Sequence, residues 1–511
     1  MTKDDILELE ITSFGMDGEG VARYLDFVVF VPMTLVGEKV LAKVVSVKKN
    51  FAICRVIKLL KASPLRREPI CPIFFSCGGC NMLHIGEEKT REIKRENLVN
   101  CLKKQGIFVN VDNVVESDKN LYYRNKMSVP ISNQNGSIVL GYYKEKTHNV
   151  VPFERCYLHD EWGNVIAKTF INYANRYKLT AYDERTKKGL LKHLVARKLG
   201  DNISIVVVIN GDSLPCYDKF CNMLKENCIK FSLAININKM HNNVILSDDT
   251  RFLYGKVTML HEVNGVKVEV SPNSFMQVND YIASRIYADV CSRIIELGNP
   301  LVLECYSGIG VMTNILASNK VKVISSEIEP SSVLNADKMA SLNHNESSIV
   351  NILGDSAIVM PIIKNAIVNK DYKGLDKLNL SEDKLNKVTS FLMTYDSEKN
   401  SEKIDNNFVK NTSQSEQNIE KNIRIENKDK KDNNREICVL VDPPRKGCHE
   451  SVLNAIVETN PNYIFYVSCS PATLARDLKS FMEKYDIISI TPYDMFPNTS
   501  HVETLVCLKR K

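Results

Sequence analysis

The chain has 511 residues, more than one hydrophobic core of ordinary size organises, so two to four domains are expected. Its hydrophobic content of 44% is typical of a soluble globular protein, the N-terminus lacks an apolar leader segment, and no apolar run approaches the length of a membrane span. The net charge of +6, from 67 Lys and Arg against 61 Asp and Glu, neither demonstrates nor excludes a nucleic-acid partner. We therefore expect a cytoplasmic protein whose 15 cysteines are reduced thiols, metal ligands or catalytic groups and not a disulfide framework.

The first stretch, to about residue 60, alternates apolar and polar side chains between glycines, which is typical of short strands in a small β-barrel. The end of this stretch is basic, with no acidic residue until Glu68; it contains Lys43, Lys48, Lys49, Arg55, Lys58, Lys61, Arg66 and Arg67. Such a run is usually only a solvated face, but on a small barrel it also suits a phosphate backbone. The pattern favours contact with RNA or DNA.

Three cysteines lie close together as Cys71, Cys77 and Cys80, with the spacing C-x5-C-x2-C. Gly78-Gly79 lets the backbone between the last two wrap tightly around a small group. In a reducing compartment this pattern indicates a zinc site or an iron–sulfur cluster. Either needs a fourth ligand, for which Cys101 and Cys156 are the downstream candidates. The five-residue gap is unlike the tight pairs of zinc sites and favours a cluster.

A charged amphipathic helix is predicted over 86–106, followed from about 111 to 270 by a mixed α+β region without a catalytic motif. Residues 190–199 and 203–209 are predicted to be paired strands. Tyr122-Tyr123-Arg124-Asn125-Lys126 combines aromatic and basic side chains, as in proteins that stack bases and hold phosphates. Tyrosines are also common in strands, so this motif is only suggestive.

From residue 271 the pattern becomes that of a βαβ unit, entered through the loop SFMQVN. The predicted elements are a helix over 281–297, strands over 301–304 and 321–325, and a helix over 332–342. The first strand ends in the turn CYSGIG, and Glu327 follows the second strand, where an acid is placed to bind a ribose diol. Because Thr313 stands where a dinucleotide fingerprint has its third glycine, a nucleoside such as S-adenosylmethionine fits better than a pyrophosphate ligand.

Residues from about 366 to 435 interrupt this pattern with a segment dominated by Asn, Lys, Asp, Glu and Ser. Such a composition buries too little apolar surface to order itself. We predict a disordered surface insertion between two strands and assign it no partner.

Two short apolar segments, Ile437–Val441 and Tyr463–Val467, are rich in β-branched or aromatic residues and are predicted to be buried strands. Asp442-Pro443-Pro444-Arg445 follows the first, and Ser468-Cys469-Ser470-Pro471 follows the second. Ligands of open α/β sheets bind at the carboxyl ends of the strands, where these motifs present a carboxylate, a guanidinium and a thiol. Either motif alone is as consistent with a strand stop or a core cysteine as with catalysis, whereas the two together favour chemistry.

Five separated elements now agree, in order, with one known family: the barrel-like start, C-x5-C-x2-C, SFMQVN, LECYSGIG and DPPRKG…SCSPATLARDL. The chain, apart from the insertion, resembles the bacterial RNA 5-methyluridine (uracil-C5) methyltransferases. Within this family it is similar to the 23S rRNA type, which has an N-terminal TRAM domain and a 4Fe–4S cluster. Two departures are conservative: Glu304 stands where Asp is usual, and Ser307 where Cys is common.

The resemblance implies a role for ten residues. Cys469 would be the nucleophile and Glu503 the base. The residues that would bind S-adenosylmethionine are Gln277, Tyr306, Glu327 and Asp442, and those that would ligate the 4Fe–4S cluster are Cys71, Cys77, Cys80 and Cys156.

The chemistry of carbon methylation explains the need for a thiol. Uracil C5 is a weak nucleophile until a thiolate adds to C6 and gives an enolate, and a base must later remove the C5 proton so that the thiol can leave. A free cysteine has a pKa of about 8.5 and needs activation. A helix predicted over 471–480 places Cys469 near a helix N-terminus, and Arg445 could supply positive charge or hold the enolate oxygen.

An amine-methylating enzyme would have an aromatic residue in place of Arg445 and would need no thiol. The target uridine must be single-stranded or flipped out of its stack.

The predicted architecture is an α/β multidomain protein. It consists of an N-terminal OB-like β-barrel (TRAM) over 1–62, a central α+β iron–sulfur domain over 63–270, and a C-terminal class I (Rossmann-like) methyltransferase sheet over 271–511 that carries the insertion. The expected partner is RNA, with rRNA favoured over tRNA; no membrane and no obligate protein partner is indicated. The alternatives are a tRNA uridine-C5 methyltransferase and, less favoured, a non-catalytic RNA-binding iron–sulfur factor.

Overall fold

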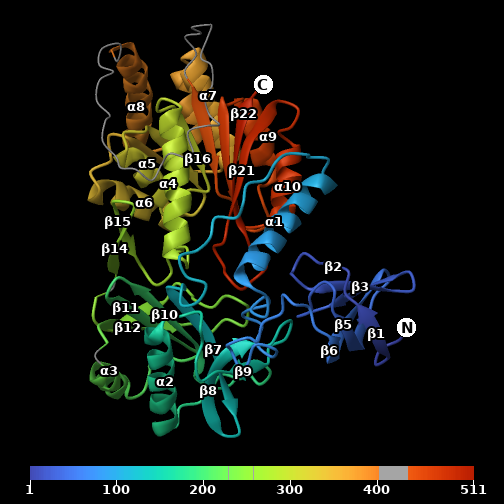
Figure 1. Cartoon of the computed structure of the whole chain (residues 1–511). Helices are drawn as coiled ribbons and strands as arrows, with labels where there is room; N and C mark the ends of the chain where they lie inside the picture. Colours follow the sequence, from blue (N-terminus) through green and yellow to red (C-terminus); the bar gives the residue numbers. More distant parts are fainter. Residues whose placement is uncertain (228, 257, 402–435) are drawn as a thin grey trace, which may run out of the picture.

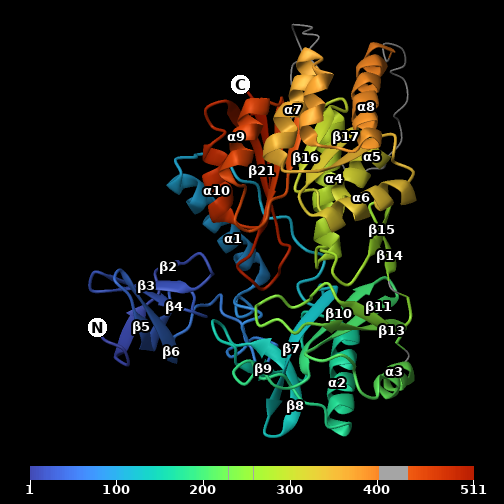
Figure 2. The ribbon, with the colours of Figure 1, turned by 180° about the vertical axis from the view of Figure 1, so that it is seen from behind.

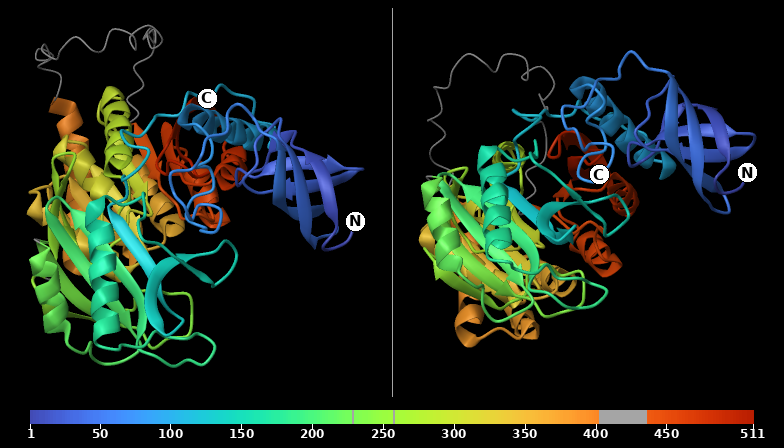
Figure 3. Two further views of the ribbon diagram at one scale, coloured as in Figure 1. Left: turned by 60° about the horizontal axis from the view of Figure 1, so that its bottom comes forward. Right: turned by 90° about the horizontal axis from the view of Figure 1, so that it is seen from below.

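The computed structural model describes residues 1–227, 229–256, 258–401 and 436–511, with side chains to residue 393 in the third range. The chain forms three parts, as Figure 1 shows: an N-terminal barrel in blue, a central α+β part in cyan and green, and a C-terminal α/β part in yellow to red. The view from behind shows the central part below the C-terminal part (Figure 2). From below, the barrel stands to one side of both (Figure 3). No helix among the described residues is long and apolar enough to cross a membrane.

The N-terminal sheet has six strands: β1 (Ile6–Glu10), β2 (Ser13–Phe14), β3 (Gly20–Tyr24), β4 (Phe27–Val31), β5 (Lys39–Val47) and β6 (Phe51–Lys61). Their order is β1-β5-β6-β4-β3-β2. Alternate side chains of β1 and β5 point into a core that includes Leu7, Leu9, Val40 and Val44, as the alternation in the sequence predicts.

The exit from the barrel is held by a buried carboxylate. Glu38 is fully buried and accepts two hydrogen bonds from Arg66, at 2.6 and 2.8 Å, and one from the backbone N–H of Leu35 at 2.8 Å. The two-bond geometry with arginine satisfies the charge that burial would otherwise leave uncompensated. Arg66, at the end of the predicted basic run, therefore has a structural partner.

Helix α1 (Glu87–Lys104) confirms the helix predicted over 86–106 and joins the barrel to the C-terminal part. It lies against the C-terminal helix at residues 471–479 (Figure 1). The Lys94 ammonium is fully buried and donates to Asp494 Oδ1 at 2.5 Å and to the Phe496 carbonyl at 3.0 Å. Removing one member of such a pair leaves an uncompensated buried charge, so this contact fixes α1 to the C-terminal part.

The central part is one mixed sheet with two helices. Its elements are β7 (Lys126–Gln134), β8 (Ser137–Tyr143), β9 (Val150–Pro152), α2 (Glu161–Arg176), β10 (Leu191–Leu199), β11 (Asn202–Ile209), α3 (Tyr217–Glu226), β12 (Phe231–Ile237) and β13 (Thr250–Tyr254). The strand order is β13-β12-β11-β10-β7-β8-β9, and β10 and β11 form the predicted antiparallel pair. Phe170 and Tyr173 of α2 pack on Phe220 of α3, with ring centroids 5.5 and 4.9 Å apart.

The C-terminal part begins with the hairpin of β14 (Met259–Val263) and β15 (Val266–Val270). The following elements are α4 (Asp280–Glu296), β16 (Leu301–Cys305), α5 (Val311–Ser318), β17 (Val323–Glu327), α6 (Pro330–Leu342), β18 (Ile349–Leu353), α7 (Ser356–Asn369), β19 (Ile437–Val441), α9 (Glu450–Thr459), β20 (Tyr463–Ser468), α10 (Pro471–Lys479), β21 (Tyr485–Tyr493) and β22 (Glu503–Arg510). The strand order is β18-β17-β16-β19-β20-β22-β21, and the alternation of strands and helices is that of the predicted α/β sheet. Both faces of this sheet are covered by helices, so its central strands β16 and β19 are buried throughout.

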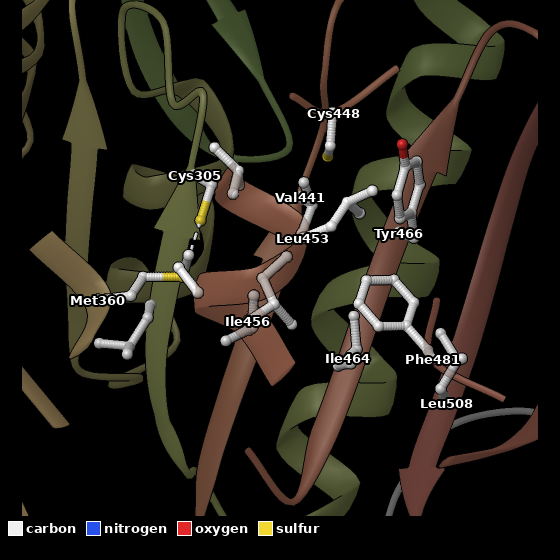
Figure 4. Close-up of a cluster of buried hydrophobic side chains, with 14 of the residues drawn as sticks. Cys305, Met360, Val441, Cys448, Leu453, Ile456, Ile464, Tyr466, Phe481 and Leu508 are labelled. Carbon is white, nitrogen blue, oxygen red and sulfur yellow. Dashed lines mark hydrogen bonds between the residues drawn. The ribbon is translucent and has the colours of Figure 1, made fainter. Parts of the chain in front are cut away.

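Figure 4 shows one of these two buried layers. Val441 and Ile464 of the sheet face Ile456 of α9 and Phe481, which follows α10. This packing holds β19 and β20 side by side, and with them the motifs that follow each strand.

The structure differs from the sequence-based prediction over 366–401. A 3-10 helix η1 (Tyr372–Leu378) and helix α8 (Glu382–Ser401) follow α7 where a disordered segment is predicted. The side chains that join the core of the sheet are Leu375, Val388, Phe391 and Leu392. Helical spacing of a few apolar residues therefore outweighs a polar composition. The rest of the predicted insertion, 402–435, lies outside the described residues.

Candidate active site

The residues predicted for catalysis and cofactor binding, apart from Gln277, lie along one edge of the C-terminal sheet. Strands β16, β17, β19 and β20 are parallel, so their carboxyl ends share that edge. Tyr306, Asp442 and Cys469 directly follow β16, β19 and β20, and Glu327 ends β17. Only the fold brings these four residues together, because they come from strands far apart in the sequence.

Cys469 and Glu503 are neighbours across two antiparallel strands. The pairing of Ser468 with Thr504 places Glu503, the first residue of β22, beside Cys469. Glu503 is only 4% exposed; burial, and after it the charge of Asp442, raise the pKa of its carboxyl to about 8. This carboxyl therefore gains and loses a proton near neutral pH, as an acid–base group requires.

The Cys469 thiol is half-buried, and its pKa is raised to about 11, first by burial and then by Glu503. Arg445 acts in the opposite direction. Helix α10 begins at Pro471, close to the predicted position, but the free protein still holds the thiol protonated. In the free protein, burial and the charge of Glu503 therefore raise the thiol pKa by more than Arg445 and the helix N-terminus lower it.

Asp442 is accessible to solvent, yet the protein atoms around it raise the pKa of its carboxyl to about 7. The exposure belongs to the residue as a whole, whereas its carboxyl is desolvated by the surrounding protein atoms, which disfavours the charged form. A cationic ligand beside this carboxyl would favour the charged form.

The turn that follows Arg445 is fixed on α10 by Asp477, which the sequence analysis did not identify. Asp477 is fully buried and accepts hydrogen bonds from the Cys448 backbone N–H at 2.8 Å and from the Tyr466 hydroxyl at 2.6 Å. Gly447 has a φ of 79°, and a Cβ there would lie 2.5 Å from Asp477 Oδ2. Asp477 thus sets the Asp-Pro-Pro-Arg turn relative to the helix that follows Cys469.

The turn after β16 has the backbone of a ligand-binding loop. Tyr306, Gly308 and Gly310 have φ values of 58°, 55° and 80°, in the left-handed region. A Cβ on Gly308 would meet no atom within 4 Å, so the space beside this residue is open. Glu327 Oε2 accepts the Gly308 N–H at 3.0 Å, and its other oxygen accepts two further backbone N–H groups. The carboxylate is thereby oriented, and its remaining lone pairs can accept hydroxyl groups.

Thr313, which replaces the third glycine of a dinucleotide fingerprint, donates from its hydroxyl to Glu304 Oε2 at 2.5 Å. Burial raises the pKa of the Glu304 carboxyl to about 8, and Asp442 adds to this shift. Tyr287 of α4 lies in the same electrostatic neighbourhood: its pKa is raised first by burial and then by Asp442, Glu304 and Glu503. In the sequence Tyr287 is an ordinary amphipathic-helix position, so only the tertiary structure places it near the site.

Gln277 lies in the loop between β15 and α4, and its backbone is held from the central sheet. The Asn125 amide donates to the Gln277 carbonyl at 3.0 Å, and the Asn125 N–H donates to the Val278 carbonyl at 2.9 Å. The predicted cofactor loop therefore depends on the Tyr-Tyr-Arg-Asn-Lys motif of the central part.

The four cysteines predicted as cluster ligands line one small cavity of about 30 Å³ in the central part: Cys71, Cys77, Cys80 and Cys156. The alternative fourth ligand, Cys101, lies elsewhere, with its sulfur 3.5 Å from that of Met16. Among the described residues, no three His, Cys, Asp or Glu side chains converge as ligands of a single metal ion. The donor set fits a larger group, because each cysteine of a 4Fe–4S cluster binds a different iron.

The comparisons with known proteins identify related sequences and one related fold. Residues 399–511 match the tRNA (uracil-5-)-methyltransferase family, and residues 4–57 match the TRAM domain. An uncharacterized RNA methyltransferase of Clostridium acetobutylicum is 31% identical, over 99% of this chain and 98% of the relative. One from Bacillus cereus is 30% identical over 99% and 97%.

A solved structure, Pyrococcus abyssi tRNA (uracil-54, C5)-methyltransferase in complex with S-adenosyl-L-homocysteine, shares the fold. Its TM-score is 0.69 at 22% identity, covering 98% of this chain and 99% of that one. The same arrangement of barrel, central part and α/β sheet is therefore found in a protein of distant sequence.

Proposed function

The chain belongs to the RNA uracil-5-methyltransferase family, and on that premise we propose that it methylates C5 of an RNA uridine through a transient bond from Cys469. The observation that carries the proposal is the pairing of a half-buried thiol with a carboxyl of raised pKa, Glu503, at the carboxyl edge of the sheet. Neither an RNA-binding scaffold nor an amine-methylating enzyme needs this pair.

The two side chains would act in sequence. The Cys469 thiolate adds to C6 of the ring and makes C5 nucleophilic, so that C5 can take up a methyl group. Bound S-adenosylmethionine supplies that group as an electrophilic carbon. The Glu503 carboxylate then removes the C5 proton, the C5–C6 double bond re-forms, and the sulfur leaves as thiolate. Arg445, which favours the thiolate, stabilises negative charge in the first step.

Four residues are proposed to hold S-adenosylmethionine: Gln277, Tyr306, Glu327 and Asp442. The open space beside Gly308 and the oriented carboxylate of Glu327 support a ribose site at the end of β17. The Asp442 carboxyl, with its pKa of about 7, supports a place near the cationic sulfur, where the charge would keep the carboxylate ionised.

The pH dependence of the reaction follows from Glu503. Its carboxyl has a pKa of about 8 and can accept a proton only when ionised, so ionisation of Glu503 makes the rate rise with pH below 8, and ionisation of the Cys469 thiol, with a pKa of about 11, extends the rise above pH 8. Because kcat/KM reports ionisations of the free enzyme, we expect kcat/KM to increase by about tenfold or more per pH unit from pH 6 to 8. A pH-independent kcat/KM over this range would contradict the role of Glu503 as base.

The cysteine cavity is proposed to hold a 4Fe–4S cluster through Cys71, Cys77, Cys80 and Cys156. Four thiolate ligands leave no open coordination position, so the cluster would be structural and no catalytic step passes through it. Protein purified without oxygen should be brown and contain about four irons per chain. Cys156→Ser should lose the iron, and the control Cys101→Ser should keep it. A colourless protein with one zinc per chain would contradict the proposal.

The substrate is proposed to be 23S rRNA, with tRNA as the alternative that the name of the matched family favours. Unmodified transcripts of both can be incubated with the protein and methyl-labelled S-adenosylmethionine and then digested to nucleosides. We expect 5-methyluridine from the rRNA. 5-Methyluridine from tRNA alone would show that tRNA, and not rRNA, is the substrate. Label in adenosine or guanosine would contradict carbon methylation.

A further inference from the structure

A second cavity, of about 230 Å³, lies where the central part meets the start of α4. Its lining includes Tyr122, Arg124, Asn125, Trp162, Lys198 and Tyr281. None of the ten residues predicted for catalysis, cofactor or cluster lines it. It is thus a separate site, and its chemistry has to be explained separately.

The cavity combines aromatic rings with hydrogen-bonding groups that lack partners. Tyr122, Trp162 and Tyr281 supply planar faces on which a base can stack. Asn125 is 7% exposed; its amide N–H groups bind Gln277 and Asp280, but its Oδ1 has no partner among the described residues. A buried acceptor without a partner is costly and suits a donor from a ligand, such as the amino or imino group of a base.

The hydrogen-bond donors of the cavity lining include basic side chains. Arg124 is one of the lining residues, and its buried Nε has no hydrogen-bond partner among the residues that the structure describes. Lys119 and Lys198 also line the cavity. Cationic side chains that line a cavity attract an anion such as a phosphate group.

The carboxylates Asp118, Asp160 and Asp280 also line the cavity, so it is not simply a phosphate pocket. Cations, carboxylates, an amide and aromatic rings together match a whole nucleotide, which presents a phosphate, ribose hydroxyls and a planar base. Tyr122 has a φ of 60°, unusual for an aromatic residue, and so is held with its ring at this cavity at a cost in backbone energy.

The cavity is coupled to the catalytic edge in two ways. Asn125 binds the backbone of Gln277 and so joins the cavity wall to the proposed cofactor loop. Helix α4 runs from Tyr281 at the cavity to Tyr287 near Asp442 and Glu503, six residues or about 9 Å along the axis. One RNA strand can therefore reach both places.

We propose that this cavity binds one unpaired nucleotide of the RNA substrate, close in the strand to the target uridine but held apart from it. The inference rests on the proposed function for the identity of the strand. The nucleotide would fix the register of the strand, so that only a uridine at a set spacing reaches Cys469.

Trp162, the single tryptophan of the chain, reports on this cavity directly. The experiment measures its fluorescence in the full-length Cys469→Ala protein, which cannot react, during titration with single-stranded oligoribonucleotides. Tyr281→Ala is the test variant, because Tyr281 is 44% exposed on the first turn of α4 and its loss should not affect folding. The matched control is Tyr217→Ala, a tyrosine 39% exposed on the first turn of α3, outside the cavity lining.

RNA should quench the Trp162 fluorescence. The Tyr281→Ala substitution should raise the apparent Kd for RNA by about 5- to 100-fold, and Tyr217→Ala should leave this Kd unchanged. RNA containing 4-thiouridine should cross-link on irradiation to a peptide with Tyr122 or Tyr281. RNA binding without quenching, or equal affinities for both tyrosine variants, would overturn the proposal while leaving the methylation function untouched. Quenching in the Cys469→Ala protein, together with no methylation of any RNA by the unchanged protein, would support the cavity and contradict the proposed function.

Discussion

The Glu503→Gln protein is expected to accumulate a covalent complex with its RNA, stable in denaturing gels and dependent on S-adenosylmethionine. Glutamine has nearly the same shape as the buried Glu503 but cannot accept the C5 proton. The sulfur of Cys469 then cannot leave, and the methylated ring stays attached to the protein. Turnover should fall by about 10²- to 10⁴-fold, the usual contribution of a positioned base.

The complex is measured with end-labelled RNA on a denaturing gel, and turnover by release of 5-methyluridine. Glu450→Gln, which changes an exposed glutamate on the first turn of α9, is the control and should behave as the unchanged protein. A Glu503→Gln protein with normal turnover and no covalent complex would show that another group removes the proton.

Replacement of Cys469 by alanine should abolish methyl transfer, a fall of at least about 10³-fold, because C5 becomes nucleophilic only after the thiolate has added to C6. S-adenosylmethionine and RNA should still bind, since the thiol is not needed for either. The control is Cys216→Ala, which removes an exposed thiol next to α3. Cys469→Ala combined with Glu503→Gln should give no covalent complex. A fully active Cys469→Ala protein would contradict the role of this residue.

The sequence predicts the catalytic sheet well because its signals are local. Ile437–Val441 and Tyr463–Val467 are short apolar runs with abrupt polar ends, and the structure has strands there as β19 and β20. The parallel α/β pattern predicts that the carboxyl ends of the strands share one edge, and the structure has Tyr306, Asp442 and Cys469 at the ends of three neighbouring strands.

The same local reasoning fails where a few contacts decide the structure. The segment before residue 402 has a polar composition, yet Val388, Phe391 and Leu392 share one face of α8 and pack on the sheet. Asp477 lies within the SCSPATLARDL motif, but its hydrogen bond to the Cys448 backbone becomes visible only in the fold, and Tyr287 belongs to no motif that the sequence analysis identified. Asn125 is part of a motif that suggests RNA binding, but its bond to Gln277 becomes visible only in the fold.

The electrostatics of the site are likewise a tertiary property. A helix N-terminus and an arginine near Cys469 predict a lowered thiol pKa, whereas burial and Glu503 raise it to about 11 in the free protein. Substrate binding therefore has to change these surroundings before the sulfur reacts. The raised pKa would keep the thiol protonated, and therefore unreactive, in the absence of RNA.

The bond between Cys469 and the pyrimidine ring is tested most directly with RNA that carries 5-fluorouridine at the target position. Fluorine at C5 cannot be removed as a proton, so the unchanged protein should stop at the covalent stage. Mass spectrometry of the digested complex should find the methylated 5-fluorouridine on the peptide that contains Cys469. Complete methyl transfer with no attached peptide, or attachment at another cysteine, would contradict the mechanism.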